Sequence, residues 1–446
     1  MSRTLHAKDL SPLDETELTA EDREWLDDVQ RRVRPSDHLL SLGDGPSSDD
    51  GDDFIVSRDV YGKWWAGRYI GDMSLGERRL EIRPRLGEVV IERWLGDVLN
   101  LVAVPETAAR QHSASFIARL MGAVWCRSVA QASRHGPPAF RRGHVHRGLY
   151  VRGKLDVRST VRLRATGSPH IASVESYRDL DNDVSRTLVA AERTLTSRIG
   201  HTLWRTPRVE EILPRLHEAV GARPRLPTRP ALGRIRYTPI TRAFKETAEL
   251  SWSLAQLQGY TAASSEGKSE GLLVDVAELW ELFVVKSMAQ ALPRLRVEHG
   301  THAARSTWLL RSQRDQRSGL GRLKPDVLAH DGDSIRLVAD AKYKRLQNDW
   351  PGRPQGHERE DLYQMTSYMA RYSPHGEALG LLVYPNAGDD AYSTADAKGP
   401  WTFESGGELR FLRLSVEIEE ARRELGELFA EVGLSQPDLR PPGIPA

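Results

Sequence analysis

The feature that most constrains the fold is a pair of short apolar segments, residues 325–330 and 334–340, joined around an Asp-Gly dipeptide. Asp-Gly between two apolar segments favours a tight turn, so the segments are predicted to pair as an antiparallel β-hairpin. Asp326 lies near the start of the first strand and Asp340 ends the second, so the pairing can bring their carboxylates together. Side chains alternate between the faces of a strand, and Lys342 therefore shares the face of Asp340. Two carboxylates and one amine are expected to converge.

This combination of side chains suits metal-assisted cleavage of a phosphodiester. Mg²⁺ prefers oxygen ligands and typically takes one or two carboxylates from a protein while keeping several waters. The bound ion lowers the pKa of a water and stabilises charge on the phosphate. Lys342 could position that water or help to deprotonate it. The Asp-x-Lys tripeptide alone is common, and strand-end carboxylates are more often solvated turn residues or surface ion pairs.

The segments around the hairpin predict a compact α/β core at residues 271–446. Apolar residues recur at helical spacing over residues 272–292, and a second helix is predicted over residues 358–371. Two more strands are predicted over residues 304–311 and 379–384. Helix, three strands, helix and strand in this order are typical of an α/β fold with a mixed sheet.

The residues before this core divide into three segments. Residues 1–53 hold a short charged helix over residues 16–34 and a Gly, Ser and Asp-rich linker, which predicts an acidic, partly flexible segment. Residues 54–202 are predicted to form an α+β domain, and residues 203–270 a connector with a helix and the flexible loop AASSEGKSEG. Strands are expected over residues 54–73, 78–87, 149–159 and 160–166, and helices over residues 89–101, 115–133, 181–196 and 241–257.

Composition narrows the classes of function. The single cysteine, Cys126, excludes an internal disulfide framework and a cysteine-based zinc cluster. The formal net charge of +1 does not by itself indicate nucleic-acid binding. No segment approaches the roughly 20 apolar residues of a membrane span, and the first residues lack a secretory signal, which predicts a cytoplasmic protein. The sequence has no G-x-x-x-x-G-K-[ST] phosphate loop and no G-x-G-x-x-G opening a helix, so neither of these nucleotide-binding motifs is present.

The dipeptide Pro325-Asp326, followed by Asp340-Ala341-Lys342, resembles the PD-(D/E)xK signature of many restriction and repair nucleases. The resemblance implies a restriction-endonuclease-like core in which Asp326, Asp340 and Lys342 are catalytic. It also implies Mg²⁺ as the cofactor, with Mn²⁺ as a possible substitute.

Two helix residues complete the site that this resemblance implies. The helix ahead of the core often contributes a glutamate, for which Glu281 is the candidate and Glu278 the alternative. Gln364, on the helix after the core, resembles the accessory glutamine of several subfamilies. Each of these residues could instead be an ordinary polar residue of a helix surface. The implied metal ligands are Asp326, Asp340, Glu281 and the main-chain carbonyl of Ala341.

A longer resemblance, over about residues 55–385, narrows the family. The segments AGRYIGDMSLGERRLEIRPRLG, YVRGKLDV, DLDNDVSRTL, RIRYTPIT, LLVDVAELWELFV, LKPDVLA, VADAKYK and DLYQMTSYM follow one another as in McrC-like proteins, the nuclease subunits of modification-dependent McrBC restriction systems. This resemblance implies double-stranded DNA as the substrate and a McrB-like AAA+ ring, using GTP or ATP, as the partner. It also implies that the domain of residues 54–202 docks into that ring. Arg85 departs from the family, which usually has a lysine after the proline.

Other functions stay open at this point. The chain could be a non-catalytic activator and scaffold of the ring that retains the nuclease fold, or a nuclease that acts without a motor. His144 and His146, two residues apart, would share one face of a strand as metal ligands do, but no cysteine or carboxylate lies nearby to favour zinc. Six basic residues could contact DNA phosphates or an acidic partner surface, or belong to a solvated loop: Arg141, Arg142, His144, His146, Arg147 and Arg152.

Overall fold

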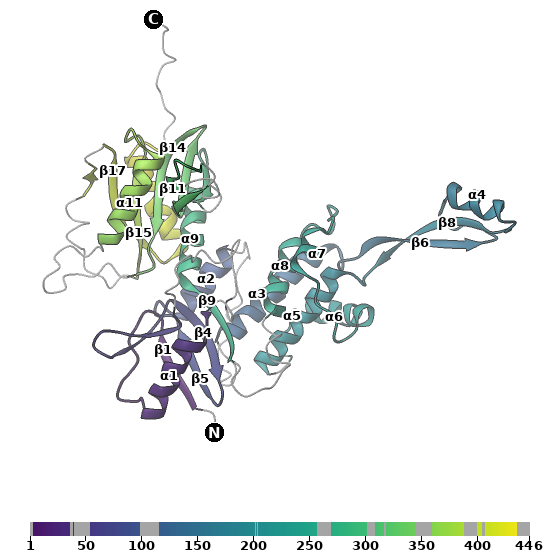
Figure 1. Ribbon diagram of the computed structural model, residues 1–446, viewed down its shortest axis with the longest axis horizontal. Coiled ribbons are helices and arrows are strands. Elements are labelled where there is room, and N and C mark those ends of the chain that lie inside the picture. The colour runs from purple at the N-terminus through teal and green to yellow at the C-terminus, as the bar shows by residue number, and fades with distance from the viewer. Residues whose placement is uncertain are drawn as a thin grey trace, which may run out of the picture. The chain divides into compact units, whose positions relative to one another are not determined.

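The computed structural model divides into two compact units, Met1–Ala103 with Gly271–Ala446, and Val104–Glu270 (Figure 1). The structure describes residues 3–35, 39, 54–98, 116–200, 202, 204–256, 269–300, 308–315, 318–344, 359–387, 399–403 and 406–434. Within these ranges, no helix has the length and apolar character needed to cross a membrane. This division differs from the four expected segments, because the first unit combines the start and the end of the chain.

A four-stranded sheet with the order β1-β5-β4-β9 lies at the start of the first unit. Its strands are β1 (Arg3–Lys8), β4 (Tyr69–Leu75), β5 (Arg78–Arg83) and β9 (Ser269–Asp275). β1 runs parallel to β5, and β4 runs antiparallel to it. Gly71 has a φ of +132°, and a Cβ there would lie 2.1 Å from the carbonyl oxygen of Leu272. Glycine at this position therefore lets β9 approach β4.

The helix predicted over residues 272–292 begins later than expected. Residues up to Asp275 belong to β9, and the helix itself is α9 (Val276–Ala291). The Asp275 side chain accepts a hydrogen bond from the main-chain N–H of Ala277 at 2.9 Å, as an N-cap residue does. The apolar residues before this cap belong to β9 and pair with β4. Because this strand is buried on both faces, its sequence lacks the apolar–polar alternation of a half-buried strand, and the segment was predicted as part of the helix.

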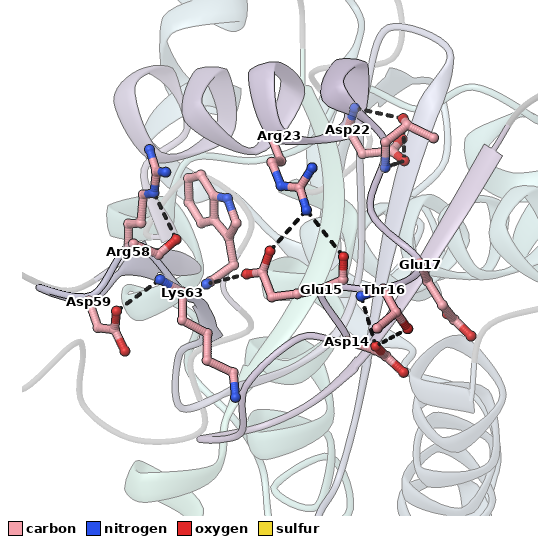
Figure 2. A network of polar contacts seen from close by, with 12 residues as sticks. Asp14, Glu15, Thr16, Glu17, Asp22, Arg23, Arg58, Asp59 and Lys63 are labelled. Carbon is pink, nitrogen blue, oxygen red and sulfur yellow. Dashed lines mark hydrogen bonds and ion pairs between the residues drawn. The ribbon is translucent and has the colours of Figure 1, made fainter.

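Residues 3–35 take part in this fold, although the sequence placed the start of the ordered domain near residue 54. β1 adds to the sheet, and α1 (Ala20–Arg32) is the predicted charged helix, closed by a capping box at Thr19. Glu15 accepts from the main-chain N–H of Trp64 at 2.9 Å and pairs with Arg23 at 3.2 Å. Figure 2 shows this network beside the short hairpin of β2 (Val56–Arg58) and β3 (Trp64–Ala66). The predicted linker after residue 42 lies outside the described residues.

A six-stranded mixed sheet forms the second core of the first unit, in the order β10-β13-β14-β15-β17-β16. β14 runs antiparallel to β13 and parallel to β15, which itself runs parallel to β17. The predicted α/β class and mixed sheet are therefore confirmed. The strands are β10 (Arg296–His299), β13 (Val327–Asp331), β14 (Ser334–Ala341), β15 (Leu379–Asn386), β16 (Trp401–Thr402) and β17 (Glu408–Ser415).

Helices cover both faces of this sheet. Met365 and Tyr368 of α11 (Arg359–Tyr372) pack with Leu328 and Val338, which identifies one face. The alternate residues of the same strands face away from α11, toward α9 and α13 (Ile418–Glu431), which contact β14 and β17. α2 (Glu88–Val98) packs against α9 through its tryptophan and an aromatic cluster. A separate two-stranded ribbon consists of β11 (Trp308–Arg311) and β12 (Gly319–Arg322).

The second unit has a helical body. α5 (Asp183–Ile199) is its most buried helix, and α8 (Phe244–Gln256) packs along it. The helices predicted near residues 115–133, 181–196 and 241–257 are therefore confirmed. The expected connector is part of this body, because its helices bury apolar residues against α5 and α8. The remaining helices are α3 (Phe116–Ala132), α6 (Pro207–Val220) and α7 (Arg229–Gly233).

A thin arm, residues 140–179, extends from this body (Figure 1). It consists of β6 (Phe140–Gly148), β8 (Ile171–Asp179) and the short β7 (Lys154–Leu155), with α4 (Val157–Ala165) near its tip. The predicted strands over residues 149–159 and 160–166 are wrong except at β7. Asp156 caps α4 by accepting from the main-chain N–H of Ser159 at 3.0 Å, and the alternation that resembled a strand is an exposed, mixed helix surface.

Candidate active site

The predicted hairpin brings Asp326 and Asp340 to the same end of the six-stranded sheet. Val327 pairs with Ala339, so Asp326 and Asp340 flank one register position on adjacent strands. Oδ2 of Asp326 accepts a hydrogen bond from the main-chain N–H of Ala341 at 2.6 Å. The two carboxylates are thereby held on neighbouring strands by main-chain geometry, as the sequence predicted.

Gly300, which the sequence did not single out, fixes the chain beside Asp326. Its N–H donates to the carbonyl of Asp326 at 3.2 Å. A Cβ at Gly300 would lie 1.6 Å from the carbonyl oxygen of Pro325, so no other residue fits without moving the strand that carries Asp326.

Lys342 lies on the same face as Asp340. Its Nζ is 2.6 Å from Oδ2 of Asp340, while its main-chain N–H donates to the carbonyl of Val383 at 2.7 Å. The sheet pairing of β14 with β15 therefore continues through this residue. The predicted convergence of two carboxylates and one amine is present in the structure.

A chain of hydrogen bonds ties Lys342 to α11. Lys342 Nζ donates to Oε1 of Gln364 at 2.7 Å, and Nε2 of Gln364 donates to the Tyr368 hydroxyl at 2.8 Å. The Tyr368 hydroxyl in turn donates to the carbonyl of Lys324 at 2.8 Å, two residues before Asp326. Gln364 therefore joins the lysine to the strand of the first aspartate.

Asp361 is a further member of this group, and its contacts were not predicted. Its side chain is buried at 5% exposure, with Oδ2 2.7 Å from Nζ of Lys344 and Oδ1 3.7 Å from Nζ of Lys342. The Tyr384 hydroxyl donates to it at 3.2 Å. Asp361, Gln364 and Tyr368 share a helix face at spacings of three and four, which was the available signal.

Glu281 is close enough to both aspartates to interact electrostatically with them. Burial, followed by the charges of Asp275, Asp340 and Glu278, raises the pKa of Glu281 to about 8. Its Oε2 lies 3.9 Å from Nε2 of His299, at the end of β10. Glu278, the alternative candidate, is also buried and lies at the start of α9.

The site carries buried carboxylates of like charge. Burial raises the pKa of Asp326 well above its usual value, and the charges of Glu281 and Asp340 add to the rise. Burial also raises the pKa of Asp340, although Lys342 opposes this. Burial works against the charge of Lys342, but Asp340 and its neighbours raise the lysine pKa overall. The raised pKa favours the charged, hydrogen-bond-donating form of Lys342.

A divalent cation would need several oxygen ligands from this site. Among the described residues, no group of three or more His, Cys, Asp or Glu side chains is arranged to hold a metal. Two carboxylates with main-chain carbonyl and water oxygens are nevertheless sufficient for Mg²⁺. A divalent cation would also relieve the repulsion that raises the carboxyl pKa values of Asp326 and Asp340. The oxygen ligands thus fit Mg²⁺.

A buried ion pair just beyond the ends of β1 and β5 contacts the strand end of the site. Asp9 is fully buried, its Oδ1 accepts from the main-chain N–H of Arg85 at 2.5 Å, and its Oδ2 lies 3.7 Å from Nε of Arg85. The Arg85 guanidinium lies 4.6 Å from the ring centroid of Tyr343, the residue after Lys342. Arg85, the departure from the family pattern, therefore reaches the neighbour of the site lysine.

The basic residues singled out near residue 145 lie elsewhere, on the arm. His144 and His146 are one strand repeat apart on β6, and the described residues around them include no group of metal-binding side chains. Arg142 pairs with Asp179 at 2.8 Å, and Arg141, Arg147 and Arg152 are exposed.

Comparison with known proteins finds one matching family model and a solved structure with the same fold. A family model described as McrBC 5-methylcytosine restriction system component matches residues 65–385, more than half of the chain. A chain from the half-complex of Thermococcus gammatolerans McrB AAA+ hexamers with bound McrC, part of a tetradecameric assembly, superposes with a TM-score of 0.59. It is 16% identical, and the match covers 96% of this chain and 100% of that one, which shows a shared fold.

A second solved structure matches more weakly. A chain from the cryo-EM structure of the Thermococcus gammatolerans McrBC complex has a TM-score of 0.41 and 16% identity, over 66% of this chain and 89% of that one. No curated protein matches the chain.

Proposed function

This chain belongs to the McrBC family of restriction system components, and from that premise we propose that it is the McrC-like subunit that cleaves DNA. The observation that carries the proposal is the meeting of Asp326, Asp340 and Lys342 at one end of the six-stranded sheet. A fold gains no stability from crowding like charges, because each buried carboxylate loses its hydration. Chemistry on a phosphodiester provides a reason for this arrangement.

Mg²⁺, or Mn²⁺ in its place, is the cofactor that these oxygen ligands suit. Asp326, Asp340 and the main-chain carbonyl of Ala341 would hold it, with Glu281 beside them. When bound, such an ion activates a water and neutralises charge on the phosphate.

The remaining side chains act by position. Lys342 carries a positive charge, so it can hold a water or a phosphate oxygen by donating to it. Gln364 and Asp361 restrict where the ammonium can lie, since both contact it from α11. The sequence left two roles open for Lys342, and the raised pKa favours orientation over proton removal.

The partner we propose is an AAA+ ring that uses GTP or ATP, and the substrate is double-stranded DNA. The similar solved structure contains McrB AAA+ hexamers with bound McrC. The arm, residues 140–179, is the element of this chain suited to docking. It exposes several apolar side chains to water, which is unfavourable unless a partner covers them, and basic side chains lie beside them. The exposed apolar residues are Val145, Leu149, Tyr150, Val151, Leu155, Val157, Val161 and Tyr177.

Cleavage by a reconstituted complex of the full chain with its AAA+ partner tests the proposal. Lys342→Ala and Asp340→Asn should each abolish cleavage while nucleotide hydrolysis by the ring continues. Lys245→Ala, at an exposed position of α8, is the matched control and should cut normally. A Mn²⁺ titration of the full chain should show binding that Asp340→Asn weakens.

The same experiment separates the alternative function. Unchanged cleavage in the Lys342 and Asp340 variants, or no cleavage by the unsubstituted complex, would leave the chain as an activator and scaffold of the ring.

A further inference from the structure

The ribbon of β11 and β12, which immediately precedes the candidate site, is exposed along both strands. None of its strand residues is buried, and Leu310 and Leu320 are 60% and 71% exposed. A two-stranded ribbon is at best marginally stable by itself, and exposed leucines add no stability in water. The ribbon therefore presents a surface whose composition suits binding better than folding.

The strand register shows how this surface is composed. Leu310 is opposite Leu320, and Trp308 is opposite Arg322. Directly opposed residues share a face, so these four side chains lie together. The Arg322 guanidinium is 4.8 Å from the ring centroid of Trp308, which holds a positive charge beside the two leucines.

The charge of the ribbon is strongly one-sided, although the whole chain carries only +1. In the described residues 308–315 and 318–324, the acidic residue is Asp315. Its carboxylate accepts from the Ser318 hydroxyl at 2.6 Å within the turn. The basic residues of the same stretch are Arg311, Arg314, Arg322 and Lys324.

The base of the ribbon is fixed to the candidate site. Only Leu323, Lys324 and Pro325 separate β12 from Asp326. The Tyr372 hydroxyl donates to the carbonyl of Leu323 at 3.1 Å, and Tyr368 donates to that of Lys324. At about 3.6 Å per residue, the Cα of Arg322 lies no more than roughly 14 Å from that of Asp326. A molecule bound along the ribbon would therefore pass close to the carboxylates.

We propose that the β11–β12 ribbon grips duplex DNA next to the bond to be cut. A two-stranded ribbon fits the major groove, where arginines reach phosphates and leucines contact the groove wall. Because most of its charged residues are basic, the ribbon favours a polyanion such as DNA as its ligand. The link from the ribbon to Asp326 is short, so the DNA bound there would be the substrate of the site. This assignment rests on the proposed nuclease function, since it takes the substrate to be DNA.

Equilibrium binding of the full chain to a fluorescent duplex oligonucleotide tests the assignment. The Lys342→Ala background prevents cutting during the measurement. Arg314→Gln and Arg322→Gln should each weaken binding about eightfold at 0.1 M salt and lower the salt slope by about 1, as expected for one lost phosphate contact. Leu310→Ser with Leu320→Ser should weaken binding while leaving the salt slope unchanged.

Arg296→Gln is the matched control, because Arg296 is exposed on β10 of the same unit and pairs with Glu298. It should bind DNA as the background does. Failure of the chain to bind duplex DNA, or ribbon variants that bind like the control, would overturn the assignment. Cleavage assays with and without Lys342→Ala report on the nuclease function separately, so the two proposals can fail independently.

Discussion

The six-stranded sheet and the arm differ in which side chains they bury and which they expose. In the sheet, Asp340 is 3% exposed, and Asp361, on the helix α11 that covers the sheet, is buried beside two lysines. In the arm, Tyr150 is 80% exposed and Val157 is 62% exposed, and no residue of α4 is buried. Charge is placed inside in one region, and apolar surface is placed outside in the other.

Both arrangements reduce stability compared with a chain of the same length that hides its apolar residues and exposes its charges. The difference indicates what each region is for. Buried charges are held in place, and the low local dielectric strengthens their electrostatic interactions, which suits catalysis. Exposed apolar side chains lose water only when another molecule covers them, which suits binding.

The largest effect is expected at the buried ion pair of Asp9 and Arg85. Its substitution tests whether this pair supports cleavage as well as folding. Arg85→Met alone leaves the buried carboxylate of Asp9 without its cationic partner, which costs about 3–5 kcal/mol of folding free energy. Adding Asp9→Asn should restore most of the stability, because the unpaired charge is removed. Cleavage should stay about tenfold low in the double variant, since Tyr343 has lost the guanidinium over its ring. Chemical denaturation and cleavage rates measure the two quantities.

The control is another ion pair of the same unit, within the four-stranded sheet. Asp72 and Arg79 lie 3.0 Å apart, and Asp72 is buried. Asp72→Asn with Arg79→Met should leave cleavage unchanged. Cleavage that recovers with stability in the Asp9 and Arg85 double variant would mean that this pair only supports the fold.

Asp361→Asn should have the next largest effect. The amide keeps the size of the side chain but loses the charge that holds Lys342 and Lys344. Residues that orient a site in this way typically change activity about 10–100-fold. Glu360→Gln, one residue earlier and exposed, is the control in the same helix. Equal cleavage by the two variants would show that the lysines are positioned without Asp361.

The sequence was sufficient for the parts of the site that follow from local rules. Strand alternation and the Asp-Gly turn placed Asp326, Asp340 and Lys342 together, and helical spacing placed Gln364 on one helix face with Asp361 and Tyr368. These inferences need only the periodicity of a strand or helix and one short connection. The roles of these residues remain predictions.

Long-range packing could not be read in the same way. β1 pairs with β5, and β9 joins β4 across almost two hundred residues, because each fills a sheet edge that only the folded chain creates. Asp9 and Arg85 meet Tyr343 for the same reason. In the arm, alternation suggested strands at residues 157–165, but these residues form α4, a helix with no buried residue, so no buried face marked its helical period in the sequence.

The smallest expected effect on stability comes from the arm. Val157→Ser with Val161→Ser should change the free energy of unfolding by less than about 0.5 kcal/mol, because both side chains are more than 60% exposed. The same variant should reduce the stimulation of nucleotide hydrolysis in the AAA+ partner, since these side chains would no longer be buried on docking. Thermal unfolding and hydrolysis assays give the two measurements.

A buried valine of the same unit provides the contrast. Val189→Ser in α5, where the side chain is fully buried, should destabilise the chain by at least about 1–3 kcal/mol. If the arm variant were equally destabilising, its valines would belong to a packed core and the contrast between the two regions would fail. If its stability and its effect on the ring were both unchanged, α4 would lie outside the docking surface, and binding would have to be assigned to the apolar residues of β6, β8 and the turn at Tyr150.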